Sequence, residues 1–335
     1  LPAIAAVGGA VVPVGLYLGY LHLFADGVGQ GGWAIPMATD IAFVVGCLAL
    51  LGSRIPTSLK IFMLSLAIID DILAVGIIAV FFSTTIKVGW LFSALGGLGL
   101  TVFLNRIGVR RIGVYIFVGS FIWLCTLKSG VHPTIAGVAL GLLTPASAWI
   151  GNESLLGIIE AAVSKLRQAN EGPDGDRRAA AQDLATAATE SVSPLERLEE
   201  SLHPWVSFMI MSVFALANAG VTVEGANATE PVTMATSIGL VLGKPLGIVG
   251  ASWLAVRLRV ATLPEGTGWP ALVGAACLGG IGFTMALFIS SLSMSGPSLA
   301  AAKLGILIGS GASLCIGMTV LAITLRPTAP ATGNE

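Results

Sequence analysis

The sequence predicts an all-α polytopic membrane protein that contains two three-helix repeats of inverted topology. Three observations carry this prediction. The 335 residues are 55% hydrophobic and only 10% charged, whereas soluble domains have about 25% charged residues. Apolar runs of membrane-spanning length recur along the whole chain. Two of these runs, one in each half of the chain, are interrupted by Pro or by closely spaced Gly.

Ten apolar runs are long enough, or nearly long enough, to cross a bilayer. The lipid core forces backbone hydrogen bonds to form within each run, so each run is expected to be a helix. The strands of a membrane barrel would alternate polar and apolar residues, and these runs do not. The expected spans are 1–24, 33–52, 58–83, 88–104, 112–127, 131–150, 204–221, 232–256, 269–292 and 300–325.

The positions of Lys and Arg predict the orientation. If residue 1 starts in the cytoplasm, 13 of the 17 basic residues fall on the cytoplasmic side and 3 on the outer side, and Lys244 lies inside a span. This imbalance agrees with the positive-inside rule and with ten spans. The net charge of −1 argues against a nucleic-acid partner.

One charged segment divides the chain. Residues 151–203 hold 15 of the 35 charged residues, and their flanks have the pattern of short amphipathic helices. The expected organisation is membrane helices over 1–150 with a first repeat at 1–83, a cytoplasmic loop at 151–203, membrane helices over 204–326 with a second repeat at 232–326, and a cytoplasmic tail at 327–335.

The two repeats share a broken middle span. Pro36 interrupts it in the first repeat, and Gly279, Gly280 and Gly282 interrupt it in the second. Seven crossings separate the starts of the repeats, so their orientations are opposite. Paired broken helices in inverted repeats are typical of secondary transporters, whose ion site lies at the breaks.

Four charged side chains lie deep within expected spans, namely Asp40, Asp70, Asp71 and Lys244. A carboxylate at the bilayer centre costs roughly 3 kcal/mol. Asp70 and Asp71 are therefore expected to bind a cation, to hold protons or to pair with a base. The alternative, a helix cap or a short loop, is disfavoured by the apolar residues on both sides. Neighbours on a helix point about 100° apart, which predicts different surroundings for the two carboxylates.

Lys244 and Asp40 have simpler alternative interpretations. Lys244 lies too far from either end of its span to bring its charge to the headgroups, so we expect a buried ion pair with an aspartate. Adjacent Pro245 favours a local break in the helix. Asp40 is expected to cap the second half-helix and to offset the positive ends of facing half-helices. Thr39 offers hard oxygen donors, which suit a small hard cation.

A carboxylate that binds either a cation or protons couples their flows by competition. Burial and a like-charged neighbour both strengthen proton binding by a carboxylate, as this competition requires near neutral pH. His132 and His203, at the ends of expected helices, are interpreted mainly as interfacial residues, with pH sensing as the alternative.

Several motifs resemble those of the NhaA-type sodium/proton antiporters of bacteria, and the resemblance covers nearly the whole chain. The motifs are ATDIAF at 38–43, ALLGSRIP at 49–56, LAIIDD at 66–71, LKSGVH at 127–132, LHPWV at 202–206, FALANAGV at 214–221, GKPLG at 243–247 and GIGFTM at 280–285.

The resemblance implies an NhaA-like fold of twelve helices in the bacterial inner membrane, of which the first two are not among the ten expected here. It also implies electrogenic, pH-regulated exchange of cytoplasmic Na⁺ or Li⁺ for external H⁺, without a cofactor. A homodimer is a further implication.

The resemblance also implies roles for single residues. Asp71 would be the principal Na⁺ ligand and proton carrier. Asp70 would be the second titrating carboxylate, which pairs with Lys244 when the cation is absent. Thr39 would be an auxiliary ligand, and Asp40 would offset the half-helix dipoles. The cluster of Glu199, Glu200 and His203 falls where the family senses pH at its cytoplasmic entrance.

Two other functions remain open at this point. A sodium-coupled solute symporter would need a larger polar cavity, and the break residues are mostly Gly, Ala, Ile and Met. An intramembrane aspartyl protease could use Asp40 with Asp71. However, the chain lacks the Gly-x-Gly-Asp motif expected of such an enzyme, and Lys244 would disturb a shared-proton dyad.

Overall fold

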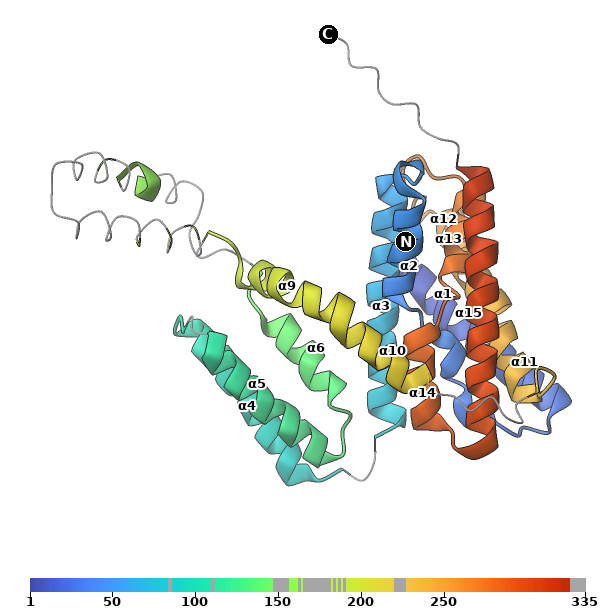
Figure 1. Ribbon diagram of the computed structural model, residues 1–335, viewed down its shortest axis with the longest axis horizontal. Helices are drawn as coiled ribbons and strands as arrows, with labels where there is room; N and C mark the ends of the chain where they lie inside the picture. Colours follow the sequence, from blue (N-terminus) through green and yellow to red (C-terminus); the bar gives the residue numbers. More distant parts are fainter. Residues whose placement is uncertain are drawn as a thin grey trace, which may run out of the picture. The chain divides into compact units, whose positions relative to one another are not determined.

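The computed structural model describes residues 1–83, 86–109, 112–146, 191–219 and 227–325, with 157–161, 164, 182, 185 and 188 between them. Every regular element in these residues is a helix, which confirms the all-helical prediction. The chain forms two compact units (Figure 1). The first unit combines Leu1–Ser83 with Ser212–Glu335, and the second is Thr84–Met211.

Seven helices in the described part of the chain are long and apolar enough to cross a membrane, or up to eight if one bent pair counts as a single span. Ten spans were expected. The difference lies in the segments 112–127 and 131–150, where the structure has the shorter apolar helices Gly113–Ser129 and Thr134–Leu143. Residues 147–150, at the end of the second segment, lie outside the described residues.

The first repeat contains three candidate spans, Pro2–Phe24, Gln30–Leu50 and Thr57–Phe81. Helix α1 is followed by two 3₁₀ turns, an extended segment, helix α2 and helix α3. One half-helix was expected on each side of Pro36. The structure has an α-helix on the carboxyl-terminal side but only 3₁₀ turns on the amino-terminal side. Four glycines between residues 27 and 32 disfavour an α-helix, and Pro36 fixes its own backbone. The bounds are α1 Pro2–Phe24, η1 Gln30–Gly32, η2 Ile35–Met37, α2 Ile41–Leu50, η3 Gly52–Arg54 and α3 Thr57–Phe81.

The second repeat has one continuous span, one broken span and one long helix. A break was expected beside Pro245, but the span Pro231–Arg257 is continuous. It widens into a π-helical stretch directly before Lys244, and a π turn accommodates the missing proline donor without ending the helix. The bounds are α11 Pro231–Ile238, η6 Gly239–Gly243, α12 Lys244–Arg257, α13 Trp269–Leu278, α14 Phe283–Ser293 and α15 Gly296–Thr324.

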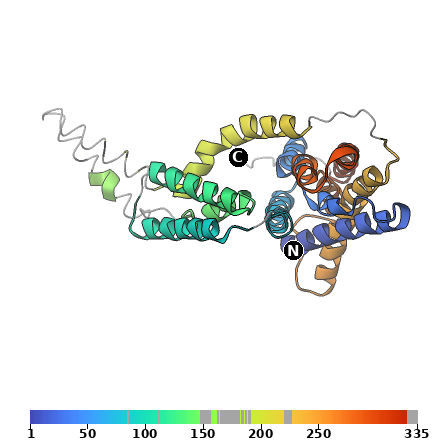
Figure 2. The same ribbon diagram turned by 90° about the horizontal axis from the view of Figure 1, so that it is seen from below.

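Close approach of α1 and α12 fixes the centre of the first unit. A Cβ added to Gly247 would lie 2.2 Å from the carbonyl oxygen of Gly8, and one added to Gly8 would lie 2.4 Å from the Cβ of Ala251. Small residues let membrane helices pack this closely. Figure 2 shows the same helices from below, with α3 and α15 seen nearly end on.

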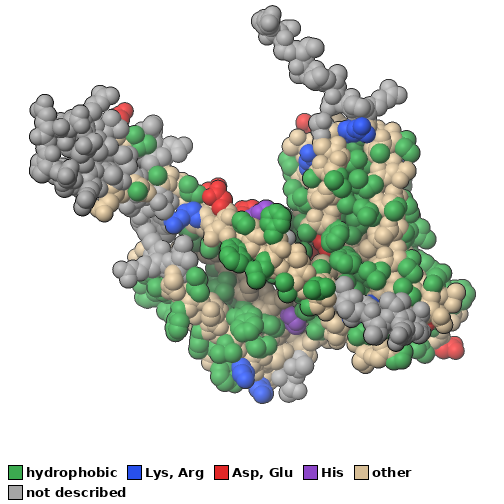
Figure 3. Space-filling model, in the orientation of Figure 1, with side chains coloured by type: hydrophobic (Ala, Val, Ile, Leu, Met, Phe, Trp, Pro, Cys, Tyr) green, Lys and Arg blue, Asp and Glu red, His purple; other side chains and the backbone are tan. Residues whose placement is uncertain are grey.

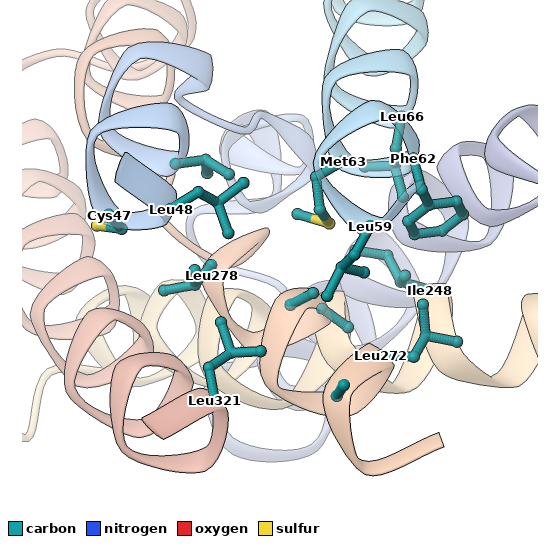
Figure 4. Close-up of a cluster of buried hydrophobic side chains, with 14 of the residues drawn as sticks. Cys47, Leu48, Leu59, Phe62, Met63, Leu66, Ile248, Leu272, Leu278 and Leu321 are labelled. Carbon is teal, nitrogen blue, oxygen red and sulfur yellow. The ribbon is translucent and has the colours of Figure 1, made fainter. Parts of the chain in front are cut away.

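Two apolar clusters fill the first unit. One joins α2, α3, α12, α13 and α15 through side chains that include Leu48, Phe62, Ile248 and Leu278 (Figure 4). The other lies around Tyr17 of α1, whose hydroxyl donates to the carbonyl oxygen of Gly29 at 2.8 Å. Hydrophobic side chains also cover much of the visible face of this unit (Figure 3), as expected for a surface in lipid.

The second unit contains α4 (Val88–Arg106), α5 (Ile112–Ser129), α6 (Thr134–Leu143), α9 (Pro194–Pro204) and the π-helical Trp205–Ile210. Helix α10 (Met211–Ala219) continues this last stretch into the first unit. Most of the expected loop 151–203 lies outside the described residues. Its last residues are helical, because Ser193 and Glu196 form a capping box that starts α9 at Pro194.

Candidate ion site at the crossed helix breaks

The two interrupted spans meet at their unwound segments, within the first unit. The backbone N–H of Asp40 donates to the carbonyl oxygen of Ile281 at 2.6 Å. The Thr39 hydroxyl donates to the carbonyl oxygen of Gly279 at 2.9 Å. Both bonds use backbone groups that would be paired within the helix if the helix were unbroken. Each break therefore supplies hydrogen-bond partners for backbone groups of the other. The pair α13 and α14 is bent by 47° at this point.

Asp40 caps two helices at once. Its Oδ1 accepts from the backbone N–H of Phe43 in α2 at 3.3 Å. Its Oδ2 accepts from the backbone N–H of Thr284 in α14 at 3.0 Å and from the Thr284 hydroxyl at 2.5 Å. The side chain is buried. One negative charge therefore faces the positive amino ends of both half-helices, which is electrostatically favourable.

Lys244 and Asp70 form a buried pair. The Nζ of Lys244 donates to the Oδ2 of Asp70 at 2.6 Å, and the two side chains are 0% and 1% exposed. Lys244 comes from the first turn of α12 and Asp70 from the middle of α3. A buried charge of either sign is costly on its own, so each residue makes the other tolerable at this depth.

Asp71 has different surroundings from its neighbour. Its side chain is half-buried, whereas that of Asp70 is buried. It lies close enough to Asp70, Asp40 and Lys244 to interact with their charges. In the described part of the chain, Oδ1 of Asp70 and Oδ1 of Asp71 are buried and have no hydrogen-bond partner. A buried carboxylate oxygen that has no hydrogen-bond donor can bind a cation or a proton instead.

The break glycines also allow close packing. A Cβ added to Gly280 would lie 2.4 Å from the carbonyl oxygen of Leu240, and one added to Gly279 would lie 2.9 Å from the Cδ1 of Ile248. The π-helical stretch of the Lys244 span therefore rests directly on the second break. At Gly282 the approach is looser, with the nearest atom at 3.0 Å.

The predicted sensing residues belong to the second unit. Glu199, Glu200 and His203 are exposed on α9. His132 lies in the loop between α5 and α6, where its Nδ1 is 2.9 Å from the Thr134 hydroxyl. Burial lowers the pKa of the His132 imidazole, which favours a neutral ring near pH 7.

Thr284 and Ser310 were not singled out in the sequence, yet both bind the breaks. Ser310 of α15 accepts from the backbone N–H of Gly282 at 3.2 Å. The position of Thr284, two residues after Gly282, is the signal that could have found it, because the second residue of a helix needs an external acceptor. Ser310 offers no such local signal.

The arrangement provides oxygen atoms of three kinds for a hard cation, namely carboxylate, hydroxyl and backbone carbonyl. Among the described residues no three His, Cys, Asp or Glu side chains gather as a metal-binding group. A cation here would therefore rely on the neighbouring carboxylates of α3 together with hydroxyl and carbonyl oxygens of the breaks. Exchange between such a cation and protons is the chemistry that this geometry permits.

Comparison with known proteins agrees with this geometry. The family model described as Na⁺/H⁺ antiporter 1 matches residues 1–321. The chain is 47% identical over 329 residues to the Na⁺/H⁺ antiporter NhaA of Rhodopirellula baltica, covering 98% of this chain and 74% of that protein. It is 48% identical over 319 residues to Na⁺/H⁺ antiporter NhaA 2 of Vibrio vulnificus, covering 95% and 70%. The chain therefore belongs to the Na⁺/H⁺ antiporter 1 family.

Proposed function

We propose that this protein is a secondary transporter that exchanges Na⁺ for H⁺ across a membrane. Its relatives from Rhodopirellula baltica and Vibrio vulnificus are named as Na⁺/H⁺ antiporters. The observation that carries the proposal here is the pair of neighbouring carboxylates in the middle of α3, one paired with Lys244 and the other half-buried beside the crossed breaks. Ionisable groups inside a membrane span are costly and mark an ion or proton pathway.

The mechanism rests on competition at Asp71. Its carboxylate takes either a cation or a proton, so release of one favours uptake of the other. The second proton belongs to the coupled pair of Asp70 and Lys244. When a cation is held, Asp70 turns from Lys244 toward it and the pair releases this proton. When the cation leaves, the ion pair of 2.6 Å forms again. Thr39 contributes its hydroxyl oxygen while the hydroxyl keeps donating to the carbonyl oxygen of Gly279.

Asp40 has a structural role in this cycle. Its two oxygens are occupied by Phe43 and Thr284 at the ends of two helices. Its role is to hold the amino ends of α2 and α14 together and to offset their positive potential, which otherwise would repel the cation.

The proposal extends to finer features, which the family resemblance and the charge pattern of the chain support. Two protons against one cation makes the exchange electrogenic, with Na⁺ or Li⁺ leaving the cytoplasm. The location is the bacterial inner membrane, with the segment 151–203 and the carboxyl terminus in the cytoplasm. The residues Glu199, Glu200, His203 and His132 set the pH response, and two copies associate as a homodimer.

A sodium-coupled symporter is not favoured. The unwound segments are closed by direct contacts, since Leu240 and Ser313 approach Gly280 too closely for even a methyl group there. A bare ion suits such a narrow crossing better than an organic solute.

Substitution of Asp71 tests the proposal. In everted vesicles or proteoliposomes, Asp71→Asn should abolish Na⁺-dependent proton release, because an amide cannot release a proton or balance a cation's charge. Asp26→Asn is the matched control. Asp26 is exposed, lies in the loop after α1 and has a φ of 46°, which Asn also tolerates. Full activity of Asp71→Asn would refute the assignment of Asp71.

A further inference from the structure

The amino end of α14 is held by groups from two other elements. Gly282 precedes the helix and has no side chain with which to cap it. The first backbone N–H groups of a helix have no partner within the helix. The N–H of Thr284 is bound by Asp40 at 3.0 Å, and the N–H of Gly282 is bound by the hydroxyl oxygen of Ser310 at 3.2 Å.

Ser310 differs from most hydroxyls on the long helices. Thr101, Thr126 and Thr236 are also buried, and each donates to the carbonyl oxygen four residues earlier in its own helix. Such bonds satisfy the hydroxyl without contacting another element. The Ser310 hydroxyl instead accepts from the unwound segment of a different span.

Helix α15 is well anchored, so this bond ties the break to a fixed support. The Thr233 hydroxyl of α11 donates to the carbonyl oxygen of Ala301 at 2.9 Å, and Ser237 donates to that of Gly305 at 3.0 Å. Farther along, a Cβ added to Gly317 would lie 2.7 Å from Leu278 of α13. The position of Ser310 is therefore set by contacts on both sides of it.

We infer that Ser310 is a positioning residue for ion exchange: it caps the amino end of α14 with a neutral group, so that Asp40 can bind Thr284 there while it also caps α2. Without this hydroxyl the Gly282 N–H would lack its acceptor, and the end of α14 would shift toward the carbonyl oxygen of Ala38 or toward Asp40. Either shift disturbs the contacts between the breaks. The inference rests on the proposed function.

Ser313 provides a matched control. It lies one turn farther along α15, is buried, and also faces the second break, because a Cβ added to Gly280 would lie 2.5 Å from its Oγ. In the described part of the chain, however, the Ser313 hydroxyl has no hydrogen-bond partner. Ser310→Ala removes a bond to the break, whereas Ser313→Ala removes only an unpaired hydroxyl.

The first measurement is the concentration of Na⁺ at half-maximal exchange in proteoliposomes, per amount of folded protein. Ser310→Ala should raise it by roughly three- to tenfold, the effect of losing about one hydrogen bond, while the maximal rate stays within about a factor of two of the wild type. Ser310→Thr, which keeps the hydroxyl, should restore the wild-type value. Ser313→Ala should not change it.

A second measurement does not need transport. Hydrogen exchange at the amide of Gly282 should be faster in Ser310→Ala than in the wild type and unchanged in Ser313→Ala. If the wild type exchanges no Na⁺ for H⁺, the proposed function fails, and this amide contrast still tests the cap.

Three results would overturn the inference. The first is an equal Na⁺ concentration at half-maximal exchange in Ser310→Ala and Ser313→Ala. The second is a loss of thermal stability in Ser310→Ala while its Na⁺ concentration at half-maximal exchange stays at the wild-type value. If Ser310→Ala gives no folded protein, Ser310→Cys is measured in its place, because its sulfur is a weak acceptor. Its Na⁺ concentration at half-maximal exchange should lie between the wild-type value and the three- to tenfold rise expected for Ser310→Ala. Failure of both variants to fold, with Ser313→Ala folded, is the third result, because it would make Ser310 a folding residue only.

Discussion

Two neighbouring aspartates of α3 have different partners because a helix turns about 100° per residue. Asp70 faces Lys244 in the buried interior, and Asp71 is half-buried. In the proposed mechanism the two carboxylates have different tasks. Asp70 balances the charge of Lys244 while no cation is held, and Asp71 is the carboxylate at which cation and proton compete.

Lys244→Ala should destabilise the protein strongly. The substitution leaves the Asp70 charge buried without a partner, which typically costs about 3–5 kcal/mol. We expect a lower melting temperature in detergent than that of the wild type. Lys244→Ala combined with Asp70→Asn should recover most of this loss, because no uncompensated charge remains. An unchanged melting temperature in the single variant would mean that Lys244 is solvated.

The charged site residues were found from the sequence, whereas only one of the hydroxyl residues at the breaks, Thr39, was. Asp40, Asp70, Asp71 and Lys244 stand out because each interrupts an apolar run at a high energetic cost. Thr284 and Ser310 do not stand out, since Ser and Thr are tolerated in membrane helices when they bond to their own backbone. Only the fold shows that these two hydroxyls bond elsewhere.

Elements with irregular backbone position the site. Lys244 follows a π-helical stretch, and Thr39 and Asp40 follow two 3₁₀ turns. The sequence indicates such irregularity through Pro36 and Pro245. The sequence does not determine which irregular backbone forms, because the same proline can end a helix, kink it or be accommodated by a wider turn. Tertiary packing decides among these outcomes.

Close packing of α12 on α1 sets the position of Lys244. Gly247→Ala should therefore displace α12, because the new Cβ would lie 2.2 Å from the carbonyl oxygen of Gly8. We expect a loss of stability of about 1–3 kcal/mol and slower Na⁺-dependent exchange, measured by thermal unfolding and in proteoliposomes.

Gly250→Ala is the control for this prediction. Gly250 lies one turn away on the same helix and has no atom within 4 Å of an added Cβ. This change should be neutral or stabilising, since Ala is the better helix former. Equal stability of the two variants would show that α1 and α12 do not need their close contact.

At the scale of the whole molecule, the sequence predicts two three-helix repeats of opposite topology. The first repeat supplies α2 with Asp40, and the second supplies α14 with Thr284. The number of crossings between the repeats and the paired breaks in the sequence predict this symmetry. They do not predict that α5 and α6 are shorter than the other membrane helices, because apolar composition alone does not mark where a helix ends.

Electrogenic exchange predicts a response to voltage. If two protons enter for each Na⁺ that leaves, one net charge crosses the membrane per cycle, which is worth about 2.3 kcal/mol per 100 mV. Proteoliposomes loaded with Na⁺ should therefore extrude it faster when a K⁺ diffusion potential makes the interior negative. The control is the same preparation with the potential collapsed. A rate that ignores the imposed potential would indicate one-for-one exchange.

The shared carboxylate of Asp40 limits how the protein can alternate. Because one side chain serves the ends of α2 and α14, the two half-helices cannot part without stripping one of them of its counter-charge. If the site opens first to one face of the membrane and then to the other, α2 and α14 must therefore move as one rigid body. The contacts that change are those between this pair and the surrounding helices.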